Sequence, residues 1–151
     1  MMCIDYFYSL LGRREYSASE LLKKGQEKGF DETEITDALN ELQLKGYQSD
    51  TRCVESMISS FQGKYGKSAI KRKCLEKGIA VDVFEQTWRS QAENETEELG
   101  ALKAKVMRKY KIESFEHIDH KTKAKLLNFL QYRGFNPFQV LEQWQTEEES
   151  E

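Results

Sequence analysis

The sequence predicts an all-helical fold made of three tandem three-helix repeats, stacked into an elongated, curved array. Three observations predict it: a composition that favours helices, a glycine-centred motif that recurs, and helix-capping residues at the expected places. The 151 residues include one proline and nine glycines, so few residues interrupt a helix. Glu, Lys, Leu and Gln are abundant, and these residues favour helix over sheet.

The recurring motif is a basic residue, a glycine and a bulky apolar residue. It occurs as Lys28-Gly29-Phe30, Lys77-Gly78-Ile79 and Arg133-Gly134-Phe135. Apolar residues stand at the same three offsets from each glycine. Eight residues before it are Leu21, Ile70 and Leu126, six residues after it are Ile35, Phe84 and Val140, and ten residues after it are Leu39, Trp88 and Trp144. The motifs recur about every 50 residues, a period typical of stacked repeats.

Capping residues define the helices within each repeat. Ser17-x-x-Glu20 and Asp31-x-x-Glu34 match capping boxes, and Asn136-Pro137 places a capping side chain before a proline. The glycine of each motif can end the preceding helix in a left-handed conformation, with the basic residue at the negative end of the helix dipole. The predicted helices are 2–11, 17–28, 31–45, 50–64, 66–77, 81–92, 97–110, 119–132 and 136–146.

These helices divide the chain into repeats at residues 1–48, 49–96 and 97–146, followed by an acidic disordered tail at 147–151. Residues 111–118 are expected to form an irregular linker inside the third repeat. Because a unit of about 50 residues buries little core alone, neighbouring repeats should stack. Such arrays typically present an extended binding surface.

The formal net charge of −3 conceals a strong segregation of charge. Residues 63–79 contain six basic residues and one acidic residue, and residues 99–135 contain nine and three. Glutamates in residues 91–98 and 147–151 offset these basic blocks. The pattern is compatible with a polyanionic partner that contacts one face of the molecule.

The same composition excludes several classes of protein. Three cysteines without CxxC spacing, Cys3, Cys53 and Cys74, predict neither a disulfide framework nor a zinc site, which fits a reducing cytoplasm. Asp5 interrupts the first apolar stretch, so it is interpreted as an amphipathic helix and not as an export signal. No segment approaches the roughly 18 apolar residues that span a bilayer, and no membrane contact is expected.

Two candidate reactive sites have simpler interpretations. His117 and His120 could face one side of a helix turn as metal ligands, but Asp119 between them is better explained as the N-cap of the following helix. Cys74 is surrounded by lysines that would activate an exposed thiol, yet its place in the repeat favours a small buried hydrophobe. Without a catalytic constellation or a phosphate loop, no enzyme activity, metal or cofactor is predicted.

Residues along the chain resemble one known family. Arg13-Arg14-Glu15-Tyr16-Ser17 with the first glycine motif resembles the first repeat of the RecX proteins, which are bacterial regulators of the RecA recombinase. The resemblance continues in order through Gly46-Tyr47, Asp50, Arg52, Gly66, Ile70 and the second glycine motif, and then through Lys109-Tyr110, Lys125 and residues 129–135. Cys53, Ala69 and Lys73-Cys74 depart from the family pattern, so exact contacts around the middle repeat cannot be transferred.

The resemblance implies a binding protein without catalytic residues. Its implied partner is the RecA nucleoprotein filament on single-stranded DNA, bound along the filament groove. Binding would inhibit filament growth, ATPase, strand exchange and the co-protease activity behind the SOS response. A monomer is expected, and a weak direct contact with single-stranded DNA is compatible with the basic blocks.

The candidate partner-binding and nucleic-acid-binding residues form a predicted basic face. They are Arg13, Arg14, Lys67, Lys71, Arg72, Lys103, Lys105, Lys109, Lys121, Lys125 and Arg133. They could contact DNA phosphates or an acidic protein surface, and the arginines suit bidentate pairing. Charge reversal at Lys105, Lys109 and Lys125 should weaken inhibition without lowering helical content.

The alternative function is a stand-alone nucleic-acid-binding helical repeat protein. Three-helix units resemble helix-turn-helix domains in outline, but a major-groove reader presents Asn, Gln or Arg on an exposed recognition helix. The third helix of the first repeat, near residues 31–45, is acidic or neutral. A binder driven by phosphate contacts should also lose affinity for naked DNA steeply with salt.

Overall fold

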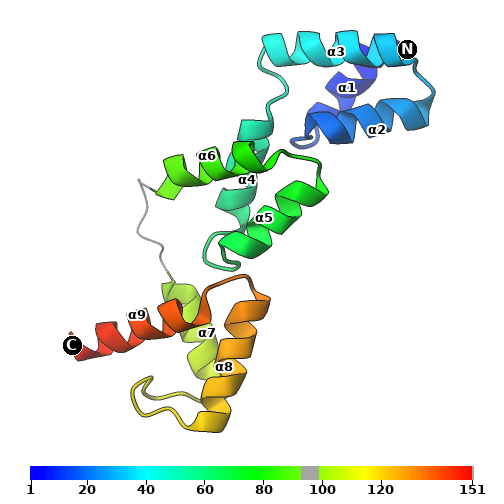
Figure 1. The fold of residues 1–151 in the computed structure, drawn as a ribbon. Coiled ribbons are helices and arrows are strands. Elements are labelled where there is room, and N and C mark those ends of the chain that lie inside the picture. The colour runs from blue at the N-terminus through cyan, green and yellow to red at the C-terminus, as the bar shows by residue number, and fades with distance from the viewer. Residues whose placement is uncertain (93–98, 151) are drawn as a thin grey trace. The chain divides into compact units, whose positions relative to one another are not determined.

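The structure is a computed structural model that describes residues 1–92 and 99–150. These residues form nine helices and no strand (Figure 1). The helices are α1 (Cys3–Leu11), α2 (Ala18–Lys28), α3 (Glu32–Leu44), α4 (Asp50–Phe61), α5 (Lys67–Glu76), α6 (Val81–Ala92), α7 (Gly100–Tyr110), α8 (His120–Tyr132) and α9 (Pro137–Glu149).

The predicted all-helical fold and its sequence of helices are confirmed. Each predicted helix is present, and its ends lie within three residues of the prediction. Residues 97 and 98, where the seventh helix was expected to begin, lie outside the described residues. The described residues form two compact units, one of residues 1–60 and 71–92 and the other of residues 61–70 and 99–150. The second repeat therefore contributes residues to both units.

In the first repeat, α1, α2 and α3 pack against one another around a core of buried side chains. Phe7 lies in this core with Leu21 from α2 and Ile35 from α3. Gly25 lets α2 approach closely, because a Cβ there would lie 2.9 Å from the Ile35 side chain. The apolar positions of the repeated motif, Leu21 and Ile35, therefore lie in the core of this repeat.

The predicted caps are present, with one difference. Ser17 and Glu20 form the complete capping box at the start of α2, and Asn136 caps α9. Asp31 accepts from the Glu34 N–H, but the Glu34 carboxylate accepts from the Cys3 N–H at 3.2 Å instead of returning to Asp31. Only half of the second predicted box therefore forms, because tertiary packing of α1 supplies a competing donor.

The third repeat has its own core, built from α7, α8 and α9 and from the loop between α7 and α8. Phe115 from that loop is fully buried, and its ring centroid lies 5.1 Å from that of Trp144. Val106, Leu126 and Leu130 complete the centre of the core. The predicted linker is thus an ordered part of the repeat.

The predicted disordered tail is wrong for residues 147–149. Helix α9 continues to Glu149, and Ser150 is its C-cap. Glu147 pairs with Lys103 at 3.0 Å, and Glu148 accepts hydrogen bonds from the α7–α8 loop. These distant partners compensate the negative charge that made the segment resemble a disordered tail; Glu151 lies outside the described residues.

Two equivalent joints connect the second helices of successive repeats, each within one compact unit. At the start of α2, the Ser17 hydroxyl donates to the Lys77 carbonyl oxygen at 2.6 Å, and the Ser19 hydroxyl donates to that of Gly78 at 3.3 Å. At the start of α5, the Gly66 N–H donates to the Arg133 carbonyl oxygen at 2.7 Å. The Ser68 hydroxyl donates to that of Gly134 at 2.9 Å.

Two of the recurring glycines, Gly78 and Gly134, take part in these joints as well as ending helices. Gly29, Gly78 and Gly134 all have positive φ, as the sequence predicts for left-handed C-terminal residues.

Across residues 1–92 and 99–150, none of the helices has the length and apolar character needed to cross a membrane.

Candidate functional site

Helix α7 carries exposed cations beside its buried side. Leu102 and Val106 point into the core of the third repeat, whereas Lys105, Arg108 and Lys109 are exposed. Their spacing of three and four residues places these three cations on one side of the helix. Arg108 was absent from the predicted site, although the same spacing in the sequence could have indicated it.

Helix α8 also has exposed lysines opposite its buried side. Lys121 and Lys125 lie one turn apart and are exposed, whereas Leu126 and Leu130 are buried. Asp119 caps this helix by accepting from the Thr122 N–H at 2.7 Å, as predicted. This hydrogen bond is the main cause that lowers the pKa of Asp119. The basic face is therefore redefined from the eleven predicted residues to four exposed cations of α7 and α8, which are Lys105, Arg108, Lys121 and Lys125.

Three other predicted site residues in the third repeat form contacts within the chain. Lys103 pairs with Glu147, and the Lys109 ammonium lies 4.8 Å from the centroid of the Phe129 ring. The Arg133 guanidinium lies 5.1 Å from the same ring and also from the Tyr65 ring, and it donates to the Lys64 carbonyl oxygen at 3.1 Å. Cation–π contacts thus bring Lys109 and Arg133 to one ring and give both a structural role.

The remaining predicted residues fall into two groups. Lys67 is exposed in the first turn of α5, and Arg13 and Arg72 are exposed in the other compact unit. Lys71 pairs with Glu85 at 2.9 Å, and Arg14 pairs with Glu20 at 3.1 Å while its guanidinium carbon lies 3.6 Å from the Tyr16 ring centroid. Lys71 and Arg14 therefore stabilise their own unit.

The pKa shift of Arg14 reflects these contacts. Desolvation by burial lowers the pKa of its guanidinium, but the hydrogen bond and the charge of Glu20 raise it by more. Arg14 therefore remains a cation that holds Glu20. The predicted bidentate contact of Arg14 with a partner would compete with this internal pair.

The predicted burial of Cys74 is confirmed. Its side chain is fully buried, and desolvation raises the pKa of its thiol to about 11 despite the opposing charge of Lys77. A thiol with this pKa is not nucleophilic at neutral pH.

Within residues 1–92 and 99–150, no group of three or more His, Cys, Asp or Glu side chains is placed to hold a metal ion.

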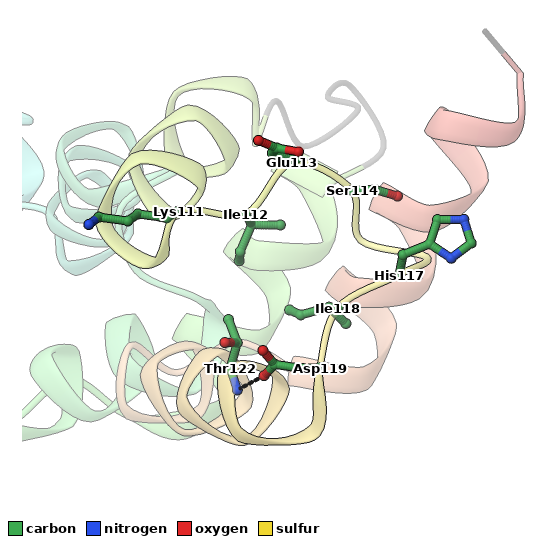
Figure 2. A pocket seen from close by; sticks show the side chains of 8 residues that line it. All are labelled: Lys111, Ile112, Glu113, Ser114, His117, Ile118, Asp119 and Thr122. Atoms are coloured by element: carbon green, nitrogen blue, oxygen red, sulfur yellow. Dashed lines mark hydrogen bonds between the residues drawn. The ribbon is translucent and has the colours of Figure 1, made fainter.

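One pocket of about 370 Å³ lies along the α7–α8 loop, where Figure 2 shows the side chains that line it. The chain enters the loop through Lys111, which has a φ of 54° and ends α7 in the left-handed conformation. His117 and Asp119 line the pocket with Ser114. The pocket combines both signs of charge, with Lys111, Glu113 and Asp119 among its lining residues.

Comparison with known proteins finds one family. The sequence profile of the family described as "RecX, first three-helix domain" matches residues 3–42. A regulatory protein RecX of Haemophilus influenzae is 39% identical over 102 residues, which cover 62% of this chain and 67% of the relative. A regulatory protein RecX of Legionella pneumophila is 36% identical over 134 residues, which cover 87% of this chain and 85% of the relative.

Solved structures agree at the level of the fold. The crystal structure of RecX from Lactobacillus salivarius matches with a TM-score of 0.76 and 18% identity, covering 95% of this chain and 94% of that one. The sequence relatives share more than a third of the aligned residues over two thirds or more of their length, and they are named regulatory proteins. The chain belongs to the RecX family of regulatory proteins.

Proposed function

We propose that this protein restrains the RecA recombinase by binding RecA filaments on single-stranded DNA, and that it inhibits filament growth, ATPase, strand exchange and co-protease activity. The observation that carries the proposal is membership of the RecX family, with a match that extends over most of the chain. The protein would act by binding alone, since no residue in the proposal converts a substrate.

The basic face supplies the charge that such binding requires. Lys105, Lys121 and Lys125 are exposed, and the described part of the chain offers them no hydrogen bond or ion pair. Exposed cations accelerate association with a polyanionic partner, and salt weakens this electrostatic attraction. Lys103 and Arg133 are instead held within the chain by Glu147 and Phe129.

The structure changes the choice of variant that tests the proposal. Lys109 contacts aromatic rings, so its reversal would disturb packing as well as charge. The sharper variant is Lys105→Glu, Lys121→Glu and Lys125→Glu together. A matched control is Lys23→Glu, Lys24→Glu and Arg89→Glu, because these exposed residues also have no hydrogen bond or ion pair within the described residues and change the net charge equally.

The measurement is the single-stranded-DNA-dependent ATPase of RecA, titrated with the wild-type protein and both variants. The basic-face variant should need roughly tenfold more protein for half inhibition, whereas the control should stay close to wild type. Unchanged helical circular dichroism confirms folding. If the basic-face variant inhibits RecA as strongly as the wild type, these lysines do not belong to the interface.

A parallel titration of the same DNA without RecA separates the alternative function. Inhibition at concentrations too low to coat naked DNA supports a filament regulator. Absence of inhibition, together with tight and salt-sensitive binding to naked DNA, would instead support a stand-alone nucleic-acid-binding protein.

A further inference from the structure

The last turn of α9 holds the α7–α8 loop through one carboxylate. Glu148 Oε1 accepts from the Phe115 N–H at 2.8 Å. Its Oε2 accepts from the Ser114 hydroxyl at 3.1 Å and from the Glu116 N–H at 3.3 Å. Figure 2 shows Ser114 with its hydroxyl directed toward α9, the pale red helix. Three donors from consecutive residues therefore converge on a single anionic group.

The loop that carries these donors is fixed by contacts of its own. Phe115 is fully buried against Trp144, and the Gln145 amide donates to the Phe115 carbonyl oxygen at 3.1 Å. The Lys103 ammonium lies 5.9 Å from the Phe115 ring and adds a positive charge. The loop is therefore also held by contacts other than those of Glu148.

Two backbone N–H groups, a hydroxyl and a nearby lysine are the donor types that bind anions in proteins. We propose that the backbone of Phe115 and Glu116, with the Ser114 hydroxyl, forms an anion site for a phosphate group, and that Glu148 is the internal occupant of this site. The contact is autoinhibitory, because an external phosphate binds only when the last turn of α9 leaves.

The donor set favours phosphate over another carboxylate. A phosphate offers separate oxygens to the two donors that share Glu148 Oε2. The nearby charges are of both signs, because Lys103 and Lys111 lie close to the loop that carries Glu113, Glu116 and Asp119. The site itself stands on its geometry, whereas a DNA phosphate as its ligand rests on the proposed function.

The test removes the internal occupant and supplies an external one. Glu148→Ala should lower the Tm by about 4 °C in sodium chloride, and sodium phosphate at equal ionic strength should restore it. Phosphate should also shift the amide NMR signals of Phe115 and Glu116, with an affinity at least about tenfold higher than in the wild type. Glu149→Ala, which removes an exposed glutamate without contacts in the described structure, should behave as the wild type.

A second variant and a second ligand complete the experiment. Glu148→Gln keeps the side-chain length and so tests the site if Glu148→Ala unfolds the turn. Rescue by inorganic phosphate alone identifies free phosphate as the ligand, and rescue also by a short oligothymidylate identifies a phosphodiester. Equal stability of both Glu148 variants in phosphate and chloride, with no shift of the two amide signals, would overturn the proposal. RecA is not present, so this result is independent of filament inhibition.

Discussion

The two joints between successive repeats use the same acceptors and different donors. At both joints, the acceptors are the carbonyl oxygens of the basic residue and of the glycine in the repeated motif. The donors come from the start of the second helix of the preceding repeat. The α2 joint uses the hydroxyls of Ser17 and Ser19. The α5 joint replaces the first hydroxyl with the backbone N–H of Gly66.

This difference shows how a repeat keeps its geometry while its chemistry changes. Ser17 uses one hydroxyl twice, because it accepts from the Glu20 N–H as an N-cap and donates to the Lys77 carbonyl oxygen. Gly66 has no side chain to offer, so its backbone must come within hydrogen-bond distance of Arg133 directly. A Cβ at Gly66 would overlap the carbonyl group of Gly134. Direct backbone contact therefore makes the α5 joint the stricter of the two.

Substitution of the joint glycines by alanine should have the largest effect and should rank the two joints. A Cβ at Gly134 would overlap the backbone nitrogen of Ala69, whereas one at Gly78 would overlap the side chain of Ser19. Gly29 has the same positive φ but open space around it. We expect losses in the free energy of unfolding of about 4 kcal/mol for Gly134→Ala, about 2–3 for Gly78→Ala and about 1 for Gly29→Ala.

Urea unfolding measures these losses, and a double variant tests their cause. Ser19→Gly removes the atom that a Cβ at Gly78 would meet, so Gly78→Ala in that background should cost only about 1 kcal/mol. No single side-chain truncation can relieve Gly134→Ala in this way, because its obstacle is backbone. Equal losses at Gly29, Gly78 and Gly134 would show that backbone strain alone explains the motif.

The helices could be predicted because their signals are local. Ser17, Asn136 and the glycines of the motif act on residues within one turn, and each occupies its predicted place. The exceptions involve distant partners. Glu34 binds the Cys3 N–H instead of completing a capping box, and Glu148 binds residues more than thirty positions away, so α9 is longer than the sequence predicts.

The candidate site could be predicted only as a collection of charges. The sequence identifies basic blocks, and Lys105, Lys121 and Lys125 are exposed as a binding role requires. It does not show which cations are already engaged, since the partners Glu85 and Glu147 of Lys71 and Lys103 are brought near by tertiary packing. Whether the exposed cations contact a partner stays a prediction.

A smaller difference between the joints should appear when their serines are replaced. Ser17→Ala removes the N-cap of α2 and leaves the buried joint without its hydroxyl, which should cost about 2 kcal/mol of unfolding free energy. Ser68→Ala should cost about 0.5–1 kcal/mol, because the Gly134 carbonyl oxygen still accepts from the Ser68 N–H at 3.3 Å. Urea unfolding of both variants gives the comparison. A larger loss at Ser68 would contradict the double role of the Ser17 hydroxyl.

The smallest expected effect is a pH dependence that belongs to the α2 joint. The Glu20 carboxylate oxygen Oε2 lies 3.4 Å from the Lys77 ammonium nitrogen and 3.1 Å from a guanidinium nitrogen of Arg14. Its Oε1 accepts a hydrogen bond from the Ser17 N–H at 2.9 Å. Burial raises the pKa of Glu20, but the hydrogen bond from Ser17 and the charges of Arg14 and Lys77 lower it by more, to a net value below its usual 4.5. A carboxylate with a lowered pKa stabilises the folded state above the unfolded pKa, and this contribution is lost as the pH falls through the folded pKa.

Glu20→Gln should therefore destabilise the protein by about 1 kcal/mol at pH 7 and progressively less below pH 4.5. Urea unfolding of wild type and variant across this range measures the difference. Glu41→Gln is the control, since Glu41 forms only an exposed pair with Lys45 and its loss should be small at every pH. In the α5 joint, Ala69 stands at the position equivalent to Glu20, so the pH dependence should follow Glu20 alone. A Glu20→Gln loss that persists unchanged at low pH would assign the role of this side chain to its shape instead of its charge.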